Sequence, residues 1–267
     1  MDYVVIGGDA RMAQLAGCLC RAGRSARHIL AGGEDARDIA SAAEMIRGAE
    51  NLAVNCPPRP RGTGLTLREL LAMARPDARV FLCGPGSTEI DDARIVDLWR
   101  DEALLRENAY LTAEGAVAAA MGRGGACIRG MKCAVIGWGR VGSAAAELLV
   151  AMGARAVVVS GSQAHRNRAV ERGVEAVPPE ALGEALTGAR LVLSTAPALV
   201  LDGAALEYAD PAAMIIDLAS PPYGVDLQAA WAQGLRAWRE PGLPGRYCPE
   251  SAGLALMRAM ERSEVSA

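Results

Sequence analysis

The amino-acid sequence predicts an α/β protein made of two doubly wound parallel-sheet domains. Three observations support this fold class. Short apolar segments alternate with helical segments along the chain, the alternation starts afresh at Lys132, and a glycine turn follows the first strand of each series. Apolar strands that alternate with helices are typical of a parallel sheet covered by helices on both faces.

The first series opens with DYVVI, which runs into Gly7 and Gly8. The strands expected in this series are 2–6, 27–32, 51–55 and 79–84, and the helices are 11–21, 34–47 and 66–74. The strands expected in the second series are 132–137, 155–160, 174–177, 191–196, 213–219 and 235–240, and the helices are 140–152, 164–172, 179–187 and 226–233. The same strand-and-helix arrangement is therefore expected twice.

A long helix is expected to connect the two series over residues 108–125, with Thr112 as its cap and Glu114 in its first turn. The PGLPG segment at 241–245 predicts a turn-rich link, and 249–263 predicts a final helix. We therefore expect a first domain, a connecting helix with its linker, a second domain, and a C-terminal helix that returns to the first domain; these parts are 1–107, 108–130, 131–245 and 246–267.

Composition excludes several classes of function. The net charge of −3 argues against a nucleic-acid surface, and the absence of a long apolar run argues against a membrane span. Lys132 is the one lysine, so a Walker phosphate loop is excluded and Schiff-base catalysis would have to use this residue. Seven scattered cysteines without a CxxC pair favour reduced core thiols and argue against a disulfide framework or a metal site. We expect a cytoplasmic protein.

The segment Gly137-Trp138-Gly139-Arg140-Val141-Gly142 is a GxGxxG pattern that follows a strand and opens a helix. In this context the first glycine allows a tight turn, the second lets backbone N–H groups approach a pyrophosphate, and the third lets helix and strand pack closely. The second domain is therefore expected to be a Rossmann-like dinucleotide-binding domain. A tight turn that binds nothing is the structural alternative. The first turn, Gly7 to Ala10, lacks this spacing.

The end of the next strand favours NADP over NAD, although NAD stays possible. An acidic residue normally holds the ribose hydroxyls of NAD about 20 positions after the motif. This sequence has no carboxylate there but offers hydroxyl groups and donors suited to a 2′-phosphate, on Ser160, Gly161, Ser162, His165 and Arg166. The alternative is that the serines only cap a helix and that Arg166 is a surface charge.

Two further strand ends are expected to line the nicotinamide side, because ligands bind at the carboxyl ends of parallel strands. These loops contain Thr195, Ala196 and Pro197, and then Leu218, Ala219 and Ser220. Ordinary capped turns are the structural alternative for each loop.

Five segments in order carry a resemblance to a known family: IGGDARM (6–12), NAYLTAEGAVAAAM (108–121), AVIGWGRVG (134–142), DLASPPYGVD (217–226) and PGLPGRYCPESAG (241–253). The set resembles the A chain of dipicolinate synthase from spore-forming bacteria, from residue 3 to about 262. The resemblance implies a nicotinamide-dependent oxidation of dihydrodipicolinate to dipicolinate in the mother-cell cytoplasm during sporulation. It also implies the flavoprotein-like B chain of dipicolinate synthase as partner. This chain is expected to form either a homodimer or a hetero-oligomer. The resemblance leads us to expect an arginine where this sequence has Gly161, a departure for which Arg166 or Arg168 could compensate.

A substrate with two carboxylates needs cationic groups, and Arg11, directly after the first glycine turn, is the first choice as anchor. Arg140 could touch either the cofactor phosphates or the substrate. No general base is assigned, since His28 is expected to open a strand and His165 belongs with the adenine end. Candidate bases are Asp9, Glu114 and Glu250, and Asn108, Thr112 and Ser220 are candidate orienting donors. Arg11 and Arg140 could instead be solvated surface charges, and Glu114 could be a first-turn carboxylate favoured by the helix dipole.

Two other functions compete with this hypothesis. A generic two-domain NAD(P)-dependent dehydrogenase of 2-hydroxy or 2-amino acids would normally use a histidine with a carboxylate, or a substrate-binding lysine, and neither is suitably placed here. A nucleotide-sensing regulatory protein that binds NADP and controls its partner is the non-enzymatic alternative, because few catalytic groups are evident.

Overall fold

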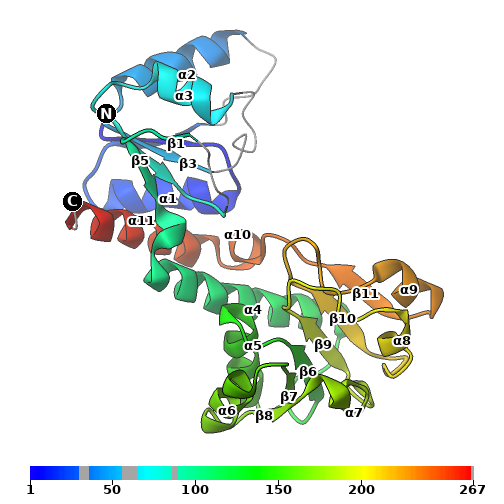
Figure 1. Cartoon of the computed structure of the whole chain (residues 1–267). Helices are drawn as coiled ribbons and strands as arrows, with labels where there is room; N and C mark the ends of the chain where they lie inside the picture. Colours follow the sequence, from blue (N-terminus) through cyan, green and yellow to red (C-terminus); the bar gives the residue numbers. More distant parts are fainter. Residues whose placement is uncertain (30–35, 56–64, 86–89, 266–267) are drawn as a thin grey trace. The chain divides into compact units, whose positions relative to one another are not determined.

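The computed structural model describes residues 1–29, 36–55, 65–85 and 90–265 (Figure 1). The chain forms two compact units. The first unit contains Met1–Asn108 together with Pro244–Ala267, and the second unit contains Ala109–Leu243. The first unit is therefore built from both ends of the chain, whereas the second is continuous in sequence.

The first unit contains a parallel sheet in the order β2-β1-β3-β4-β5. Its strands are β1 (Tyr3–Ile6), β2 (Ala26–Ile29), β3 (Asn51–Val54), β4 (Arg79–Leu82) and β5 (Ile95–Asp97). The chain order reverses between β1 and β3, which makes the carboxyl ends of these two strands the switch point of the sheet. The sequence did not lead us to expect β5.

The C-terminal helix completes the first unit. The helices here are α1 (Ala10–Arg21), α2 (Ala36–Gly48), α3 (Leu67–Met73), the 3-10 turn η1 (Leu98–Arg100), α10 (Leu243–Tyr247) at the boundary, and α11 (Pro249–Val265). α11 packs against α1, so its predicted return to the first domain is confirmed (Figure 1). Polar contacts also hold it there, including hydrogen bonds from the Tyr3 hydroxyl to Glu264 at 2.9 Å and from Arg262 to Asp101 at 2.7 Å.

The second unit contains a parallel sheet in the order β11-β10-β9-β6-β7-β8. Its strands are β6 (Lys132–Ile136), β7 (Arg155–Val159), β8 (Glu175–Val177), β9 (Leu191–Ser194), β10 (Met214–Asp217) and β11 (Arg236–Arg239). This is the strand order of dinucleotide-binding sheets, with the switch point between β6 and β9. The predicted α/β fold class with two doubly wound parallel sheets is confirmed.

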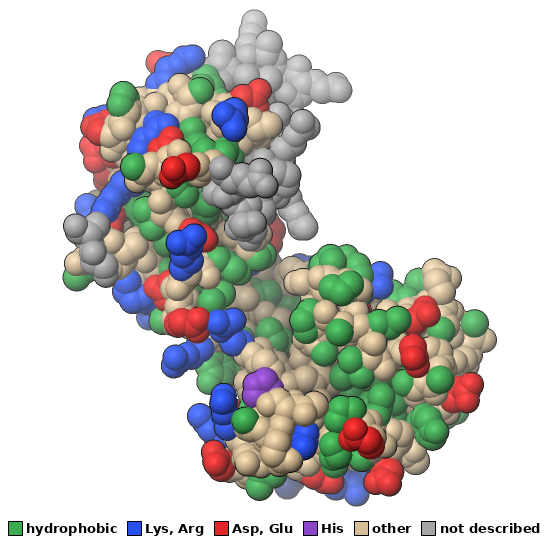
Figure 2. Space-filling model, in the orientation of Figure 1, with side chains coloured by type: hydrophobic (Ala, Val, Ile, Leu, Met, Phe, Trp, Pro, Cys, Tyr) green, Lys and Arg blue, Asp and Glu red, His purple; other side chains and the backbone are tan. Residues whose placement is uncertain are grey.

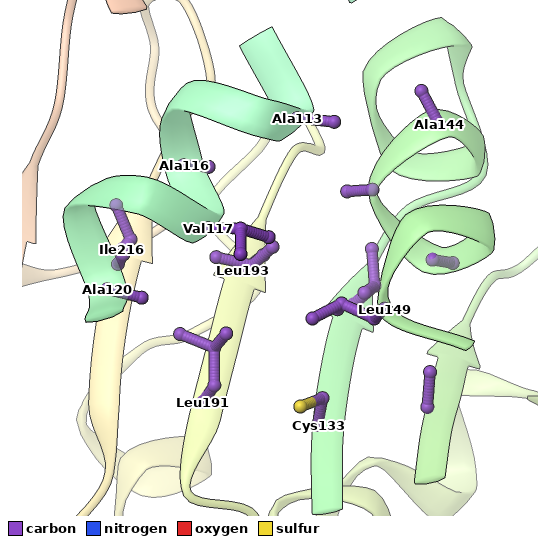
Figure 3. Close-up of a cluster of buried hydrophobic side chains, with 14 of the residues drawn as sticks. Ala113, Ala116, Val117, Ala120, Cys133, Ala144, Leu149, Leu191, Leu193 and Ile216 are labelled. Atoms are coloured by element: carbon purple, nitrogen blue, oxygen red, sulfur yellow. The ribbon is translucent and has the colours of Figure 1, made fainter. Parts of the chain in front are cut away.

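Helices cover both faces of the second sheet: α5 (Arg140–Ala151), α6 (Gln163–Glu171), the 3-10 turn η2 (Pro179–Ala181), α7 (Leu182–Leu186), α8 (Gly203–Leu206) and α9 (Leu227–Ala232). On one face, small side chains of α4 (Glu102–Gly124) and α5 pack on the aliphatic side chains of the strands (Figure 3). Ala113, Ala116 and Val117 of α4 meet Leu193 and Ile216 of the sheet in this layer. Alanine allows the helices to lie close to the strands.

The connecting helix begins earlier than predicted. α4 starts at Glu102, and Asp101 caps it by accepting a hydrogen bond from the Leu104 N–H at 2.9 Å. The prediction that Thr112 caps this helix and that Glu114 lies in its first turn is therefore wrong, because both lie in the middle of α4. The boundary between the units also falls within α4, after Asn108.

Smaller differences concern short elements. α10 begins inside the predicted PGLPG link, α8 was not expected, and the predicted helix 179–187 divides into η2 and α7. His28 does not open its strand but is the third residue of β2. Six of the cysteines lie in the described part of the chain and are free, and three of them, Cys18, Cys83 and Cys133, are buried.

No helix in the described ranges has the length and apolarity needed to cross a membrane. Within the same ranges, no group of three or more His, Cys, Asp or Glu side chains is arranged to hold a metal ion. Acidic and basic side chains are interspersed on the visible face of both units (Figure 2).

Candidate functional site

The turn between β6 and α5 has the geometry that a dinucleotide-binding turn requires. Gly137 has a φ of 104°, a left-handed conformation that favours glycine, and a β-carbon added there would lie 2.8 Å from Thr195 Oγ1. A β-carbon on Gly142 would clash with the Gly137 carbonyl and would lie 2.8 Å from the same Thr195 oxygen. The first and third glycines are thus required by close packing within the turn.

The second glycine differs from the other two. Gly139 is the N-cap of α5 and makes no side-chain capping bond, and a β-carbon added to it would meet no described atom within 4 Å. The N-terminus of α5 therefore faces open space, where its backbone N–H groups and the positive end of its dipole favour an anion. These features fit the pyrophosphate of a dinucleotide. Arg140 beside it is exposed and Val141 is half-buried.

The residues predicted to contact a 2′-phosphate lie together at the end of β7 and the start of α6. Ser160 is buried, Gly161 and Ser162 are exposed, and His165 is half-buried. The Ser162 hydroxyl caps α6 by accepting a bond from the His165 N–H at 3.3 Å. Arg166 folds back, and its Nη1 donates to the Ser160 carbonyl at 2.6 Å. Arg166 thus holds the turn in place, while the side chain of Arg168 on the same helix is exposed.

The loops predicted for the nicotinamide side follow two adjacent strands, β9 and β10. Thr195 Oγ1 donates to the Ile136 carbonyl at 2.9 Å, which ties the end of β9 to the glycine turn. Ala196 is half-buried and Pro197 exposed. In the second loop Leu218 and Ala219 are half-buried, and Ser220 is exposed. The loop after β9 lies beside the β6–α5 turn, because β9 pairs with β6, and the loop after β10 is one strand further along the sheet.

Asp217 organises the second of these loops and was missed in the sequence. Its buried carboxylate accepts backbone hydrogen bonds from Ala219 at 3.1 Å, from Gly224 at 3.2 Å and from Val225 at 3.3 Å. Arg239 of β11 lies 3.6 Å from the same carboxylate and stacks on the ring of Tyr223 at 3.8 Å. Asp217 lies inside the predicted strand 213–219 and is the last residue of the observed β10. Nothing local marked its carboxylate, and only the tertiary structure brings Arg239 to it.

In the first unit, the turn between β1 and α1 holds an internal ion pair. Asp9 caps α1 by accepting from the Arg11 N–H at 3.0 Å. The Arg11 guanidinium returns to the same carboxylate, with Nε to Oδ1 at 2.9 Å and Nη2 to Oδ2 at 2.9 Å. A β-carbon added to Gly245 would lie 2.6 Å from the Asp9 carboxyl carbon, so this carboxylate rests on the backbone of Gly245. Arg11, the expected substrate anchor, is therefore fixed by Asp9.

Two more side chains lie at this turn. His28 Nε2 lies 3.0 Å from the Gly7 carbonyl oxygen, and with a proton on this nitrogen it donates to that oxygen. Asn55, directly after β3, is 9% exposed. A single polar residue before a proline-rich segment gave no signal in the sequence, and Asn55 becomes notable only because β3 lies beside β1.

The remaining predicted residues are dispersed. Asn108 is the last residue of the first unit's longer segment, whereas Thr112 and Glu114 belong to the second unit. Asn108 and Thr112 are half-buried and Glu114 is exposed. Glu250, in the first turn of α11, lies 3.6 Å from Arg21 as an exposed ion pair.

Comparison with known proteins agrees with this geometry. Residues 127–223 match a protein family described as "Putative NAD(P)-binding". The chain is 32% identical over 169 residues to the A chain of dipicolinate synthase of Bacillus subtilis, an alignment that spans 63% of this chain and 57% of that protein. The matched part is thus little more than half of the relative's length.

Solved structures match over almost the entire chain. The crystal structure of the A chain of dipicolinate synthase from Bacillus halodurans has a TM-score of 0.77 and 22% identity, covering 98% of this chain and 97% of that one. The structure of the A chain from Bacillus subtilis has a TM-score of 0.76 and 22% identity, covering 100% and 96%. At this level of identity these matches establish the shared fold.

Proposed function

We propose that this chain, a homologue of the A chain of dipicolinate synthase, oxidises dihydrodipicolinate to dipicolinate with NADP as the hydride acceptor. The single observation that carries the proposal is the β6–α5 turn, whose outer glycines are held by packing while Gly139 leaves the end of α5 open. We further propose that it acts in the mother-cell cytoplasm with the flavoprotein-like B chain, as a hetero-oligomer.

The cofactor would be held by the second unit. The N–H groups at the start of α5 would bind the pyrophosphate, and Ser160, Ser162, His165 and Arg166 would lie nearest the 2′-phosphate. The loop held by Asp217 and the loop after β9 would line the nicotinamide. When bound, NADP supplies the acceptor for a hydride.

The residues of the chain bind and orient the substrate. Arg11 Nη1 makes no hydrogen bond with the described residues, so this edge of the guanidinium can donate to a substrate carboxylate while Asp9 holds the other edge. Fixing the guanidinium in advance reduces the entropy lost when the substrate binds.

The oxidation removes a hydride and a proton from the dihydro ring. Bound NADP would accept the hydride and water would take the proton, which leaves the ring aromatic and balances the reaction. Because aromatisation is strongly downhill, orientation of the two reactants can supply most of the rate enhancement. A dedicated side-chain base is not required.

The experiment is a reconstitution with the B chain, dihydrodipicolinate and either NADP or NAD. We expect pyridine dicarboxylate and NADPH to form in equal amounts, and only when both proteins are present. Oxidation of 2-hydroxy acids by the chain alone would overturn the proposal in favour of a general dehydrogenase. NADP binding without any turnover would instead support a regulatory role.

The anchor is tested by Arg11→Ala, with the exposed Arg68→Ala as the matched control in the same unit. We expect the Arg11 variant to lose at least tenfold in kcat/KM for dihydrodipicolinate, and the control to keep the activity of the parent chain. Unchanged turnover in Arg11→Ala would remove Arg11 from the site.

A further inference from the structure

The β1–α1 turn of the first unit carries donors that the fold itself does not use. The backbone N–H groups of Gly8 and Ala10 form no hydrogen bond with the described residues. By contrast, the N–H groups of Gly7, Arg11 and Met12 are occupied by Ile29, Asp9 and Asp9 respectively. Two nearby backbone donors are therefore available at the positive end of α1, a helix of 12 residues.

The side chain of Asn55 is a further polar group beside the β1–α1 turn. Asn55 is 9% exposed, and its side-chain amide makes no hydrogen bond with any residue in the described ranges. A β-carbon added to Gly8 would lie 3.0 Å from Asn55 Cβ and 3.1 Å from Cγ, so the amide lies against the backbone of the turn. An amide that is held against the turn and has no partner among the described residues can donate to an anion bound there.

The position in the sheet is also that of a ligand site. Asn55 follows β3 and Gly8 follows β1, and the order β2-β1-β3-β4-β5 reverses between these two strands. Open α/β sheets bind ligands at the carboxyl ends of the strands at this point of reversal.

Local charge favours an anion of limited size. The charge of the Asp9 carboxylate is balanced by the Arg11 guanidinium, so the helix dipole is not cancelled. Asp9 also occupies the Arg11 N–H, which leaves fewer backbone donors than a pyrophosphate needs. The donors that remain match the two oxygens of one carboxylate.

We propose that Asn55 and the N–H groups of Gly8 and Ala10 form an anion subsite that holds one carboxylate of the substrate ring. The inference rests on the proposed function for the identity of the substrate. Free phosphate has the same chemistry, and the two anions are distinguished by the test.

The test is calorimetric titration of the full chain with pyridine-2,6-dicarboxylate, and separately with inorganic phosphate. The variants are Asn55→Leu, which removes the amide, and Asn55→Asp, which adds a negative charge. We expect both to weaken dicarboxylate binding at least tenfold, and Asn55→Asp to weaken it more. The exposed Asn167→Asp on α6 adds the same charge to the second unit and should leave this affinity unchanged.

Amide resonances of the unmutated chain provide a measurement that does not depend on the folding of a variant. The N–H signals of Gly8 and Ala10 should shift on titration with dicarboxylate and follow the calorimetric affinity. Unshifted signals, equal affinity in the Asn55 variants, or an Asn55-dependent site that takes phosphate but no dicarboxylate would each overturn the subsite.

Failure of the subsite and failure of the proposed function give different results. NADP binding and turnover report on the proposed function, because they involve the second unit and the B chain. If the chain oxidises dihydrodipicolinate while the Asn55 variants bind dicarboxylate normally, only the subsite is wrong. If dicarboxylate binds through Asn55 but no oxidation occurs with the B chain, only the proposed function is wrong.

Discussion

The two glycine-containing turns of this molecule begin alike and end differently. Each follows the first strand of a parallel sheet and opens a helix of 12 residues. In the first unit the N-cap is Asp9, whose carboxylate fills part of the helix end and binds Arg11. In the second unit the N-cap is Gly139, which has no side chain and leaves the helix end open.

This difference in the N-cap should determine which kind of anion each helix end can bind. A helix end without a side-chain cap keeps its backbone N–H groups for a pyrophosphate, whereas the Asp9 carboxylate occupies one of these donors and leaves room for a single carboxylate. Under the proposed function, one residue at the cap would distinguish the cofactor turn from the substrate turn within the same fold.

The largest effect is expected when the β6–α5 turn is given the acidic N-cap of the β1–α1 turn. In Gly139→Asp the new carboxylate should cap α5 and repel the pyrophosphate, weakening NADP binding by about 100-fold, since like charges in contact cost several kcal/mol. Fluorescence titration with NADPH measures the affinity. Gly139→Ala is the control, because its methyl group meets no described atom, so its melting temperature should stay at that of the parent chain. Unchanged NADPH affinity in Gly139→Asp would mean that the pyrophosphate binds elsewhere.

Removing the first cap should affect stability. Asp9→Ala deletes the N-cap of α1 and leaves the Arg11 guanidinium, whose side chain is 14% exposed, without its carboxylate. We expect the free energy of unfolding to fall by about 1–2 kcal/mol, measured by urea denaturation. Ser162→Ala removes an exposed cap in the second unit and should cost less. An equal loss in both variants would contradict a special role for the Asp9–Arg11 pair.

The C-terminal helix belongs to the first unit alone, and Tyr3 tests that attachment. Burial, followed by the hydrogen bond to Glu264, raises the pKa of Tyr3 to about 12. Tyr3→Phe should lower the free energy of unfolding at neutral pH by about 1 kcal/mol. The neutral phenol is the favoured form, so its contribution is complete below pH ~10 and is lost as the pH rises toward ~12. The stability difference between parent and variant should therefore shrink across that range. A constant difference would show that the neutral Tyr3 phenol is not the source of the stabilisation.

The smallest expected effect concerns the turn between β7 and α6, where the 2′-phosphate of NADP is proposed to bind. Gly161 is exposed, and a β-carbon there would meet only Pro179 Cγ at an ordinary 3.8 Å. Gly161→Arg should tighten NADP binding by about fivefold, as expected for one exposed ion pair with a phosphate. Titration with NAD is the control, because NAD lacks the 2′-phosphate and its affinity should not change. Equal tightening for both cofactors would show that the arginine contacts another group.

Periodicity predicted the sheets well because each strand carries its own signal. The six strands of the second unit are mostly buried aliphatic runs, and all six were expected close to their observed bounds. β5 was missed because no helical segment was recognised between it and the preceding strand, whereas β8, which is equally short, was expected because it follows a predicted helix. The start of α4 was misplaced because Thr112 is a good capping residue by type, whereas the actual cap, Asp101, is recognised by its bond to Leu104.

The glycine turn was predicted from spacing, since the backbone alone builds it. Asp217, Arg239 and Asn55 were not, because each acts through partners distant in sequence: Asp217 meets Arg239 only when β10 pairs with β11, and Asn55 meets Gly8 only when β3 pairs with β1. Local motifs reveal backbone geometry, and they do not reveal which side chains a sheet brings together.

The single lysine gives the chain a built-in chemical reporter. Lys132 Nζ donates to the carbonyl oxygens of Glu184 and Thr187, both at 2.8 Å, and so closes the last turn of α7. Reagents that acylate lysine side chains can attack only Lys132, and acylation requires its nitrogen to leave the two carbonyl oxygens. The labelling rate of Lys132 would therefore measure how often its nitrogen leaves these two carbonyl oxygens, without introducing any probe.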